Sequence, residues 1–228
     1  MFKKLSNIGD CGIVCDFGDE VSQKINTDVI KLFHFIKEEV LKGRIKGILN
    51  YTPSYNKLII NFDLKEINSL QIIDFIKSVN FEKLNFSQNK KEWIIPICYD
   101  FEMDLANMSK TLKMDKDEII DIHLNTNFFI YMVGFIPGHP FMGDLDSKLF
   151  LERLKTPRVK LPSGAVGIVE KFCNIYPYES PGGWNIIGRT PVKLFDARNE
   201  ISPCLLSPGD SVKFKLISKK EFEKLNNE

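Results

Sequence analysis

A short run rich in proline and glycine, Ser180-Pro181-Gly182-Gly183-Trp184, has a composition that could serve chemistry. Paired glycines after a proline let backbone N–H groups come close to a ligand, and a concave group of N–H donors suits a carboxylate or a phosphate. A tight turn before a strand at 184–187 would need the same residue types. The residues alone therefore leave a ligand-facing loop and a plain turn both open.

Two arginines, Arg158 and Arg189, stand close to prolines and could bind an anion. The chain has 26 lysines but only 5 arginines, which suggests that arginine is used where its planar fork of donors is needed. A guanidinium on a rigid turn can bind the carboxylate of a substrate, or an acidic surface of a partner, through two hydrogen bonds. The alternative is a structural arginine that donates to loop carbonyl groups. Arg153 and Arg198 are interpreted as surface residues.

Further polar and aromatic side chains lie in the same region. Glu179 is next to Ser180 and could act as a general base, but adjacency in sequence does not orient one side chain on another, so a helper or capping role is favoured. Tyr176 and Trp184 suit the wall of a cleft and a core equally well. His139 could change charge near neutral pH, although an exposed polar residue is the favoured interpretation.

The other titratable residues do not form a recognisable catalytic set. His34 and His123 are interpreted as structural, and Asp144 and Asp146 fit a turn better than a metal site. The five cysteines form no CxxC pair, and we interpret them as buried small hydrophobic residues of a protein in the reducing cytoplasm. Catalytic residues are therefore left unassigned and no metal site is predicted. No P-loop sequence is present, so ATP would not be held by a P-loop.

The overall composition excludes several classes of protein. The chain has 228 residues, 43% of them hydrophobic, which is enough for one large core or two small ones. A net charge of +1 without a basic stripe disfavours a nucleic-acid partner. No apolar run approaches the roughly 20 residues of a membrane span. The N-terminal lysines are not followed by the apolar segment of a signal peptide.

The composition changes near the middle of the chain, which predicts two domains. Nine of the 11 prolines and nine of the 14 glycines fall in residues 131–228. The predicted boundaries are a first domain at 1–85, a linker at 86–91 and a second domain at 92–228. Both domains are large enough to bury a core.

The hydrophobic spacing predicts elements in each domain. In the first domain the expected order is a strand, a helix capped by Gly43, two strands and a helix, at 11–17, 21–41, 45–51, 57–62 and 67–79. This order is most of a ferredoxin-like split βαβ motif. The second domain is expected to be an all-β barrel with small helices, with strands at 93–99, 128–135 and 211–217 and helices at 104–113 and 116–124.

Three stretches of the second domain are too particular to be generic turns. They read GFIPGHPFMG at 134–143, TPRVKLPSGAVGI at 156–168 and IYPYESPGGWNIIGRT at 175–190, and Pro208-Gly209-Asp210 follows before the last strand. Together they resemble a family that includes the B component of 5-oxoprolinase, allophanate hydrolase subunit 1 and the sporulation-kinase inhibitor. The resemblance covers essentially the whole chain.

The resemblance implies an α+β fold, with a small ferredoxin-like α/β N-terminal domain followed by a cyclophilin-like β-barrel domain. It also implies the B component of an ATP-dependent 5-oxoprolinase complex, in which ATP is the co-substrate that activates the lactam of 5-oxoproline for opening to glutamate. The implied partners are the homologous C component and a third component, A, of the same complex, and the chain alone is expected to be inactive. The alternatives are a regulatory module that inhibits a sporulation-type histidine kinase, and a hydrolase subunit of the allophanate/urea pathway.

The resemblance places a substrate cleft in segments 134–143, 158–164 and 176–189. The candidate substrate-binding residues are Phe135, Pro137, Gly138, His139, Arg158, Pro162, Gly164, Tyr176, Glu179, Ser180, Gly182, Gly183, Trp184 and Arg189. The sequence departs from the family pattern at two places: His139 replaces an expected Phe, and Phe172-Cys173-Asn174 replaces the usual Gln-Thr-Gly. These departures concern the contacts to substrate.

Overall fold

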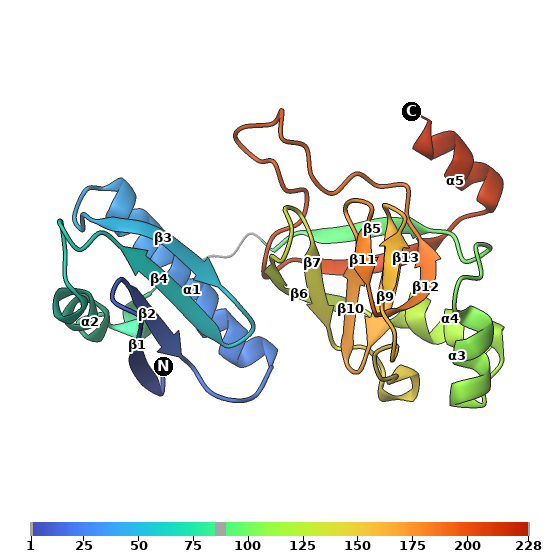
Figure 1. Cartoon of the computed structure of the whole chain (residues 1–228), viewed down its shortest axis with the longest axis horizontal. Coiled ribbons are helices and arrows are strands. Elements are labelled where there is room, and N and C mark those ends of the chain that lie inside the picture. Colours follow the sequence, from blue (N-terminus) through green and yellow to red (C-terminus); the bar gives the residue numbers. More distant parts are fainter. Residues whose placement is uncertain (1, 85–89, 228) are drawn as a thin grey trace. The chain divides into compact units, whose positions relative to one another are not determined.

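The computed structural model describes residues 2–84 and 90–227, which belong to two compact units (Figure 1). The first unit is residues 1–89 and the second is residues 90–228. The linker predicted at 86–91 falls largely on residues 85–89, outside the described residues. Each unit has a hydrophobic core of its own.

The first unit is an antiparallel sheet with a long helix across one face (Figure 1). Its strands have the order β1-β2-β4-β3. The elements are β1 (Lys4–Ile8), β2 (Gly12–Asp16), α1 (Gln23–Leu41), β3 (Ile48–Pro53), β4 (Lys57–Phe62), α2 (Ser69–Lys77) and the short 3-10 helix η1 (Phe81–Lys83). Helix α1 buries its apolar stripe, including Val29, Leu32 and Ile36, against the sheet.

The succession β2, α1, β3, β4, α2 is the predicted split βαβ motif. The hydrogen bonds at the end of α1 confirm the predicted cap, because Gly43 has a φ of +67° and its N–H donates to the carbonyl of Val40. The remaining strand, β1, was not predicted. It pairs with β2 through a hairpin at Gly9 and is mostly exposed, so its sequence lacks the alternation of apolar residues that marks a half-buried strand.

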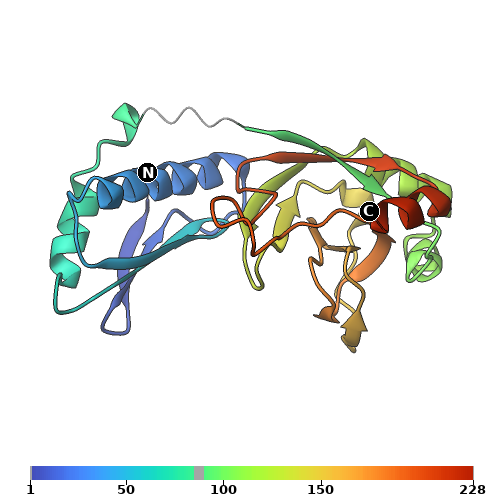
Figure 2. The ribbon, with the colours of Figure 1, turned by 90° about the horizontal axis from the view of Figure 1, so that it is seen from above.

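The second unit is a nearly closed barrel of seven strands in the order β12-β9-β10-β7-β6-β13-β5. The strands are β5 (Glu92–Ile97), β6 (Phe128–Val133), β7 (Pro140–Gly143), β9 (Ala165–Val169), β10 (Phe172–Ile175), β12 (Asn185–Arg189) and β13 (Ser211–Leu216). Figure 2 shows β5 and β13 side by side, and they are parallel. The two ends of the sheet meet where Cys98 and Arg189 exchange two backbone hydrogen bonds of 2.8 and 2.9 Å.

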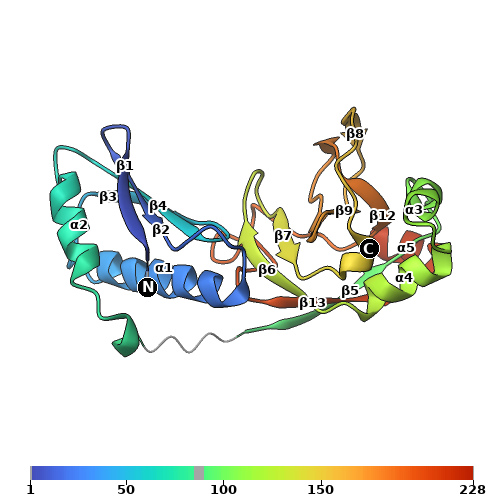
Figure 3. The ribbon, with the colours of Figure 1, turned by 90° about the horizontal axis from the view of Figure 1, so that it is seen from below.

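Smaller elements surround the barrel. They are α3 (Leu105–Leu112), α4 (Lys116–Asn125), the 3-10 helix η2 (Ser147–Leu149), β8 (Arg158–Leu161), β11 (Ser180–Gly182) and α5 (Lys219–Asn226). Strands β8 and β11 pair only with each other, and Figure 3 shows this ribbon projecting from the barrel. The α+β fold with a cyclophilin-like barrel is thus confirmed, and the β8–β11 ribbon is an addition to it.

Alternation along the strands sorts the barrel residues onto two faces. Met142, Val166, Ile168, Cys173 and Ile175 point into the main core of the barrel. Their neighbours point outward, where Leu161 of the ribbon, Ala165, Tyr176 and Ile186 form a separate small core. The ribbon therefore covers part of the outer face of the barrel, and this covered region positions the candidate site.

Candidate functional site

The floor of the candidate site is a row of residues that crosses four strands on the outer face of the barrel. Asn174 of β10 lies opposite Phe141 of β7 on one side and opposite Gly167 of β9 on the other. Gly167 in turn lies opposite Ile186 of β12. A Cβ at position 167 would be 2.8 Å from Oδ1 of Asn174, so the glycine makes room for the amide.

Alternation places two more side chains beside this row. His139 is two residues before Phe141 and Tyr176 is two residues after Asn174, so all four face outward. The His139 ring is stacked on Phe141 with centroids 4.8 Å apart and an interplanar angle of 8°, and it is 5.1 Å from the Tyr176 ring. Residues far apart in sequence are thus brought together by strand register.

The ribbon and the turn after it form the other wall. Pro181, Gly182 and Trp184 face the outward row, and the cleft between them has a volume of about 260 Å³. A Cβ at Gly182 would lie 2.5 Å from the Tyr176 hydroxyl, so only glycine allows the ribbon to come this close. Phe135 lines the same cleft but is 74% exposed, and its ring meets His139 edge-on at 5.8 Å.

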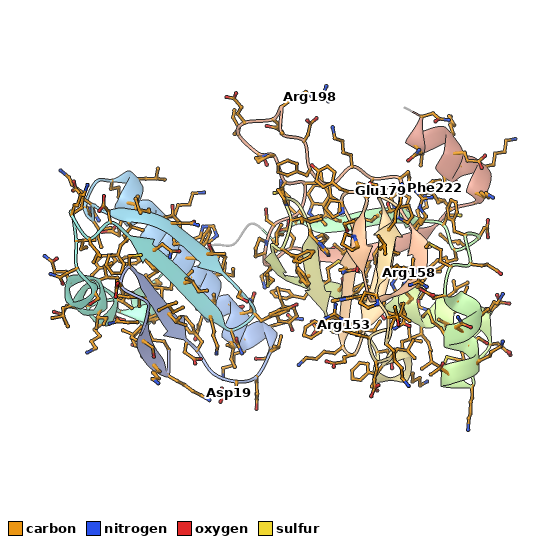
Figure 4. All side chains as sticks on the ribbon, in the orientation of Figure 1. Asp19, Arg153, Arg158, Glu179, Arg198 and Phe222 are labelled. Atoms are coloured by element: carbon orange, nitrogen blue, oxygen red, sulfur yellow. The ribbon has the colours of Figure 1, made fainter. Side chains whose placement is uncertain are left out.

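Arg153 contributes the positive charge of the cleft, and Figure 4 labels it on the barrel unit. Its side chain is exposed, yet its backbone is fixed on both sides. The carbonyl of Glu152 accepts a 2.9 Å hydrogen bond from Nδ2 of Asn185, and the N–H of Leu154 donates to the carbonyl of Gly183 at 2.8 Å. The surface position predicted for Arg153 is confirmed, but the guanidinium lies at a cleft.

Two polar groups in the cleft are buried without a hydrogen-bond partner among the described residues. His139 is 1% exposed, and neither Nδ1 nor Nε2 is paired. Asn174 is also 1% exposed, and its Oδ1 is unpaired. The interpretation of His139 as a surface residue is therefore wrong, because strand alternation turns the ring under the ribbon. Burial lowers the pKa of His139 to about 4, so the ring is neutral at pH 7 and offers one donor and one acceptor.

Tyr176 supplies a third polar group. Burial raises the pKa of its phenol, while the Asn174 side chain, the backbone of Trp184 and the charge of Arg153 act in the opposite direction. The hydroxyl is therefore protonated at pH 7 and can donate a hydrogen bond. Tyr176 and Trp184 are 2% and 9% exposed, so each is a core residue that also forms a cleft wall.

Five of the predicted substrate-binding residues line this cleft, and they are Phe135, His139, Tyr176, Gly182 and Trp184. The cleft also contains four residues that the sequence did not single out as cleft-lining, namely Phe141, Arg153, Asn174 and Pro181. A signal for two of them was present. Once β7 and β10 are recognised as strands, the period of two places Phe141 on the face of His139 and Asn174 on the face of Tyr176.

Arg158 does not line the cleft but forms an ion pair with a buried carboxylate. One guanidinium nitrogen donates to the carboxylate of Asp104, which is 2% exposed. The second oxygen of Asp104 accepts a 2.7 Å hydrogen bond from the N–H of Ile186. Arg158 therefore connects the ribbon to the barrel through a carboxylate of this chain itself.

Arg189 also lies outside the cleft lining. Its guanidinium stands over the rings of Phe101 and Phe222, at 4.7 and 5.2 Å from their centroids, and it donates to the carbonyl of Ser163 at 3.1 Å. Burial lowers the pKa of this guanidinium. The guanidinium thus makes one hydrogen bond and two ring contacts within the chain, and its buried Nε has no hydrogen-bond partner among the described residues.

The other predicted residues have structural surroundings. Glu179 is exposed and pairs with Lys160 at 2.9 Å, and Ser180 makes one long contact of 3.4 Å with the carbonyl of Pro181. Gly164 has a φ of +78°, and a Cβ there would lie 2.0 Å from the carbonyl oxygen of Thr190. Pro137, Gly138, Pro162 and Gly183 are also absent from the described lining of the cleft.

Other candidate centres do not assemble. Among the residues that the structure describes, no three His, Cys, Asp or Glu side chains come together as a metal site requires. His123 is buried and its Nδ1 is 2.8 Å from the Tyr99 hydroxyl, which confirms its structural interpretation. Cys11 is exposed and Cys204 is half-buried, so the interpretation of all five cysteines as buried is wrong at these two. None of the described helices is both long and apolar enough to span a membrane.

Comparison with known proteins identifies the family. A family model described as "Carboxyltransferase domain, subdomain C and D" matches residues 3–206. The chain belongs to this family. This carboxyltransferase-domain protein is 32% identical over 238 aligned residues to the B subunit of 5-oxoprolinase from Bacillus subtilis (strain 168), and the alignment covers 99% of this chain and 97% of the relative.

Solved structures extend the comparison of the carboxyltransferase-domain protein. A crystal structure of TTHA0988 is similar with a TM-score of 0.78 and 29% identity, over 90% of this chain but only 40% of that chain. The chain thus spans less than half the length of TTHA0988. Urea amidolyase of K. lactis is similar with a TM-score of 0.75 over 96% of this chain and 15% of that chain, and at 21% identity this similarity concerns the fold alone.

Proposed function

We propose that this chain is the B component of an ATP-dependent 5-oxoprolinase complex, which opens 5-oxoproline to glutamate. The observation that supports the proposal is the 32% identity, over 99% of the chain, to a protein named as the B subunit of 5-oxoprolinase. In the net reaction one water opens the lactam and one water receives the phosphoryl group of ATP, giving glutamate, ADP and phosphate.

The site supports a role as one part of a larger enzyme. The described residues of the cleft offer a cation, a neutral imidazole, a phenol and an amide, but none of the cleft-lining residues is a carboxylate or a thiol that could act as base or nucleophile. A cleft of about 260 Å³ with one guanidinium also does not suit a triphosphate, which needs several cations or N–H donors. We propose that the homologous C component and the third component, A, provide the ATP-binding site and the missing catalytic groups.

The experiment is reconstitution with the proteins encoded beside this one. Purified chain, the two candidate partners and all combinations of them are assayed for glutamate formed from 5-oxoproline, with and without ATP. We expect ATP-dependent glutamate only when all three components are present, and no useful turnover by the single chain.

Each rival function predicts a different result when its own substrate or kinase is tested with the same purified proteins. Turnover of allophanate or urea, but not of 5-oxoproline, would assign the chain to the urea pathway. Inhibition of the autophosphorylation of a histidine kinase by this chain, without any turnover, would assign a regulatory role. Activity of the single chain that disappears in an inactive point mutant would overturn the proposal that the chain depends on partners.

A further inference from the structure

We infer that the cleft between the barrel and the β8–β11 ribbon is the binding site for the lactam substrate, with the lactam edge at His139 and Asn174 and the carboxylate at Arg153. The identity of the ligand rests on the proposed function. The assignment of these residues rests on the geometry of the cleft.

The charge and shape of the cleft select a small anion with a flat, partly apolar body. The walls are largely aromatic, and a cleft of about 260 Å³ is at the small end for ligand sites, so a single-ring metabolite fits better than a nucleotide. Arg153 is the cation among the described residues that line it, and no carboxylate lines it. A guanidinium on a fixed backbone binds a ligand carboxylate through two hydrogen bonds.

The unpaired groups select an amide. A buried polar atom without a partner is unfavourable, and native proteins contain few of them. The neutral His139 ring has one N–H donor and one acceptor nitrogen, and Oδ1 of Asn174 is an acceptor. A lactam presents one N–H and one carbonyl on the same edge, so it can donate to Oδ1 of Asn174 and accept from the His139 ring. A simple imino acid such as proline lacks the carbonyl for this pairing.

His139 and Asn174 come from separate segments of the chain, which the strand register brings together. Asn174 lies on β10 and pairs with Phe141 of the neighbouring strand β7. His139 directly precedes β7, and its ring stacks on the ring of Phe141. Both side chains thus contribute hydrogen-bonding groups to one cleft. Phe135 is 74% exposed and edge-on to His139, so it is the wall that can turn aside when a ligand enters.

The test is an NMR titration of the labelled full chain, which follows the side-chain amide of Asn174 and the indole N–H of Trp184. The probes are 5-oxoproline, 2-pyrrolidinone, which lacks the carboxylate, and proline, which lacks the lactam carbonyl. We expect 5-oxoproline to shift both signals, 2-pyrrolidinone to do so more weakly, and proline to bind at least tenfold more weakly than 5-oxoproline.

Variants then separate the two ends of the ligand. Arg153→Gln should weaken the binding of 5-oxoproline roughly tenfold or more and leave the binding of 2-pyrrolidinone unchanged. His139→Phe should weaken the binding of both lactams. The matched control is Arg198→Gln, because Arg198 is exposed, pairs with Asp196 and lies on the loop between β12 and β13, away from Arg153 in Figure 4. It should bind both ligands as the unchanged chain does.

Several results would overturn the inference. One is that Arg153→Gln weakens the binding of both lactams equally, and another is that the Arg198→Gln control weakens binding as much as Arg153→Gln does. The inference also fails if proline binds as tightly as 5-oxoproline, or if the chemical-shift changes are confined to residues outside the cleft. If the isolated chain binds nothing, the KM for 5-oxoproline of the assembled complex decides, and an unchanged KM in Arg153→Gln also rejects the inference. A complex that lacks oxoprolinase activity while the cleft still binds the lactam rejects the proposed function instead.

Discussion

His139 combines full burial with a titratable ring, which makes the stability of the barrel unit depend on pH. Its pKa falls from the ordinary 6.5 to about 4 in the folded chain because burial disfavours the charged form. Between these values the unfolded chain binds a proton at His139 and the folded chain does not. The free energy of unfolding therefore falls as the pH is lowered through this range, by roughly 3 kcal/mol for the whole difference in pKa.

We predict that His139→Phe removes this part of the acid sensitivity. Stability is measured by urea unfolding with tryptophan fluorescence, which reports the barrel unit because Trp93 and Trp184 both lie in it. The loss between pH 6.5 and 4 should be about 3 kcal/mol smaller in the variant. His123, whose pKa is lowered to about 3, keeps its own share in both proteins. His34→Phe, in the first unit, is the control; an acid response of His139→Phe equal to that of the unchanged chain would contradict the prediction.

The residues of the cleft show what the sequence could and could not predict. Chain segments near 134–143 and 176–184 were identified from their turns and motifs, and Tyr176, Trp184 and Gly182 do line the cleft. The role of Asn174 depends on which way it faces, and this follows only when the limits and register of β10 are known. The rarity of arginine draws attention to Arg158 and Arg189, but rarity does not reveal whether the anion or ring that a guanidinium contacts belongs to a ligand or to the chain.

At the scale of elements, helix α5 is attached to the barrel by the buried ring of Phe222 and by Lys219, whose N–H donates to Asp100 at 3.3 Å. Phe222 is 4% exposed and packs edge-on against Phe101 with centroids 4.9 Å apart, below the Arg189 guanidinium. The backbone of Arg189 closes the barrel at Cys98, so the attachment of α5 lies next to the closure. Loss of the Phe222 ring should therefore weaken both the attachment of α5 and the closure of the barrel.

We predict that Phe222→Ala lowers the free energy of unfolding of the barrel unit by about 3 kcal/mol, because a buried aromatic ring and its cation–π contact are lost. Hydrogen exchange should become faster first in α5 and then at the amides of Cys98 and Arg189. Leu225→Ala, on an exposed part of the same helix, should change stability by less than about 0.5 kcal/mol. Equal effects of the two substitutions would show that α5 is not held by Phe222.

Elements with a strong hydrophobic period were predictable and those without it were not. Helix α1 and strands β2, β4 and β6 have buried faces that their sequences show. Strands β1, β8 and β11 are short, lie at edges or in an isolated ribbon, and are largely exposed, so neither burial nor alternation marks them. The covering ribbon of the cleft is built from two of these strands, which is why the cleft could be located only approximately.

At the scale of the whole molecule, the increase in proline and glycine after residue 130 reflects the turns of the barrel unit. The first unit is built on one long helix, α1, and four strands, whereas the barrel unit joins many short strands through tight turns and therefore needs most of the glycines and prolines. The hydrophobic core of each unit is built from residues of that unit alone. The described residues of the cleft all belong to the second unit, so its geometry is set by contacts within that unit.

We therefore predict that a fragment of residues 90–228 folds alone and retains the cleft. A unit of this length with its own core can be stable by itself. Its urea transition, followed by tryptophan fluorescence, should give a free energy of unfolding within about 0.5 kcal/mol of the same transition in the full chain, since no core residue of the barrel comes from the first unit. The amide of Asn174 and the indole of Trp184 should keep their chemical shifts. A fragment that aggregates, or that folds with these two signals displaced, would show that residues of the first unit support the barrel and its cleft.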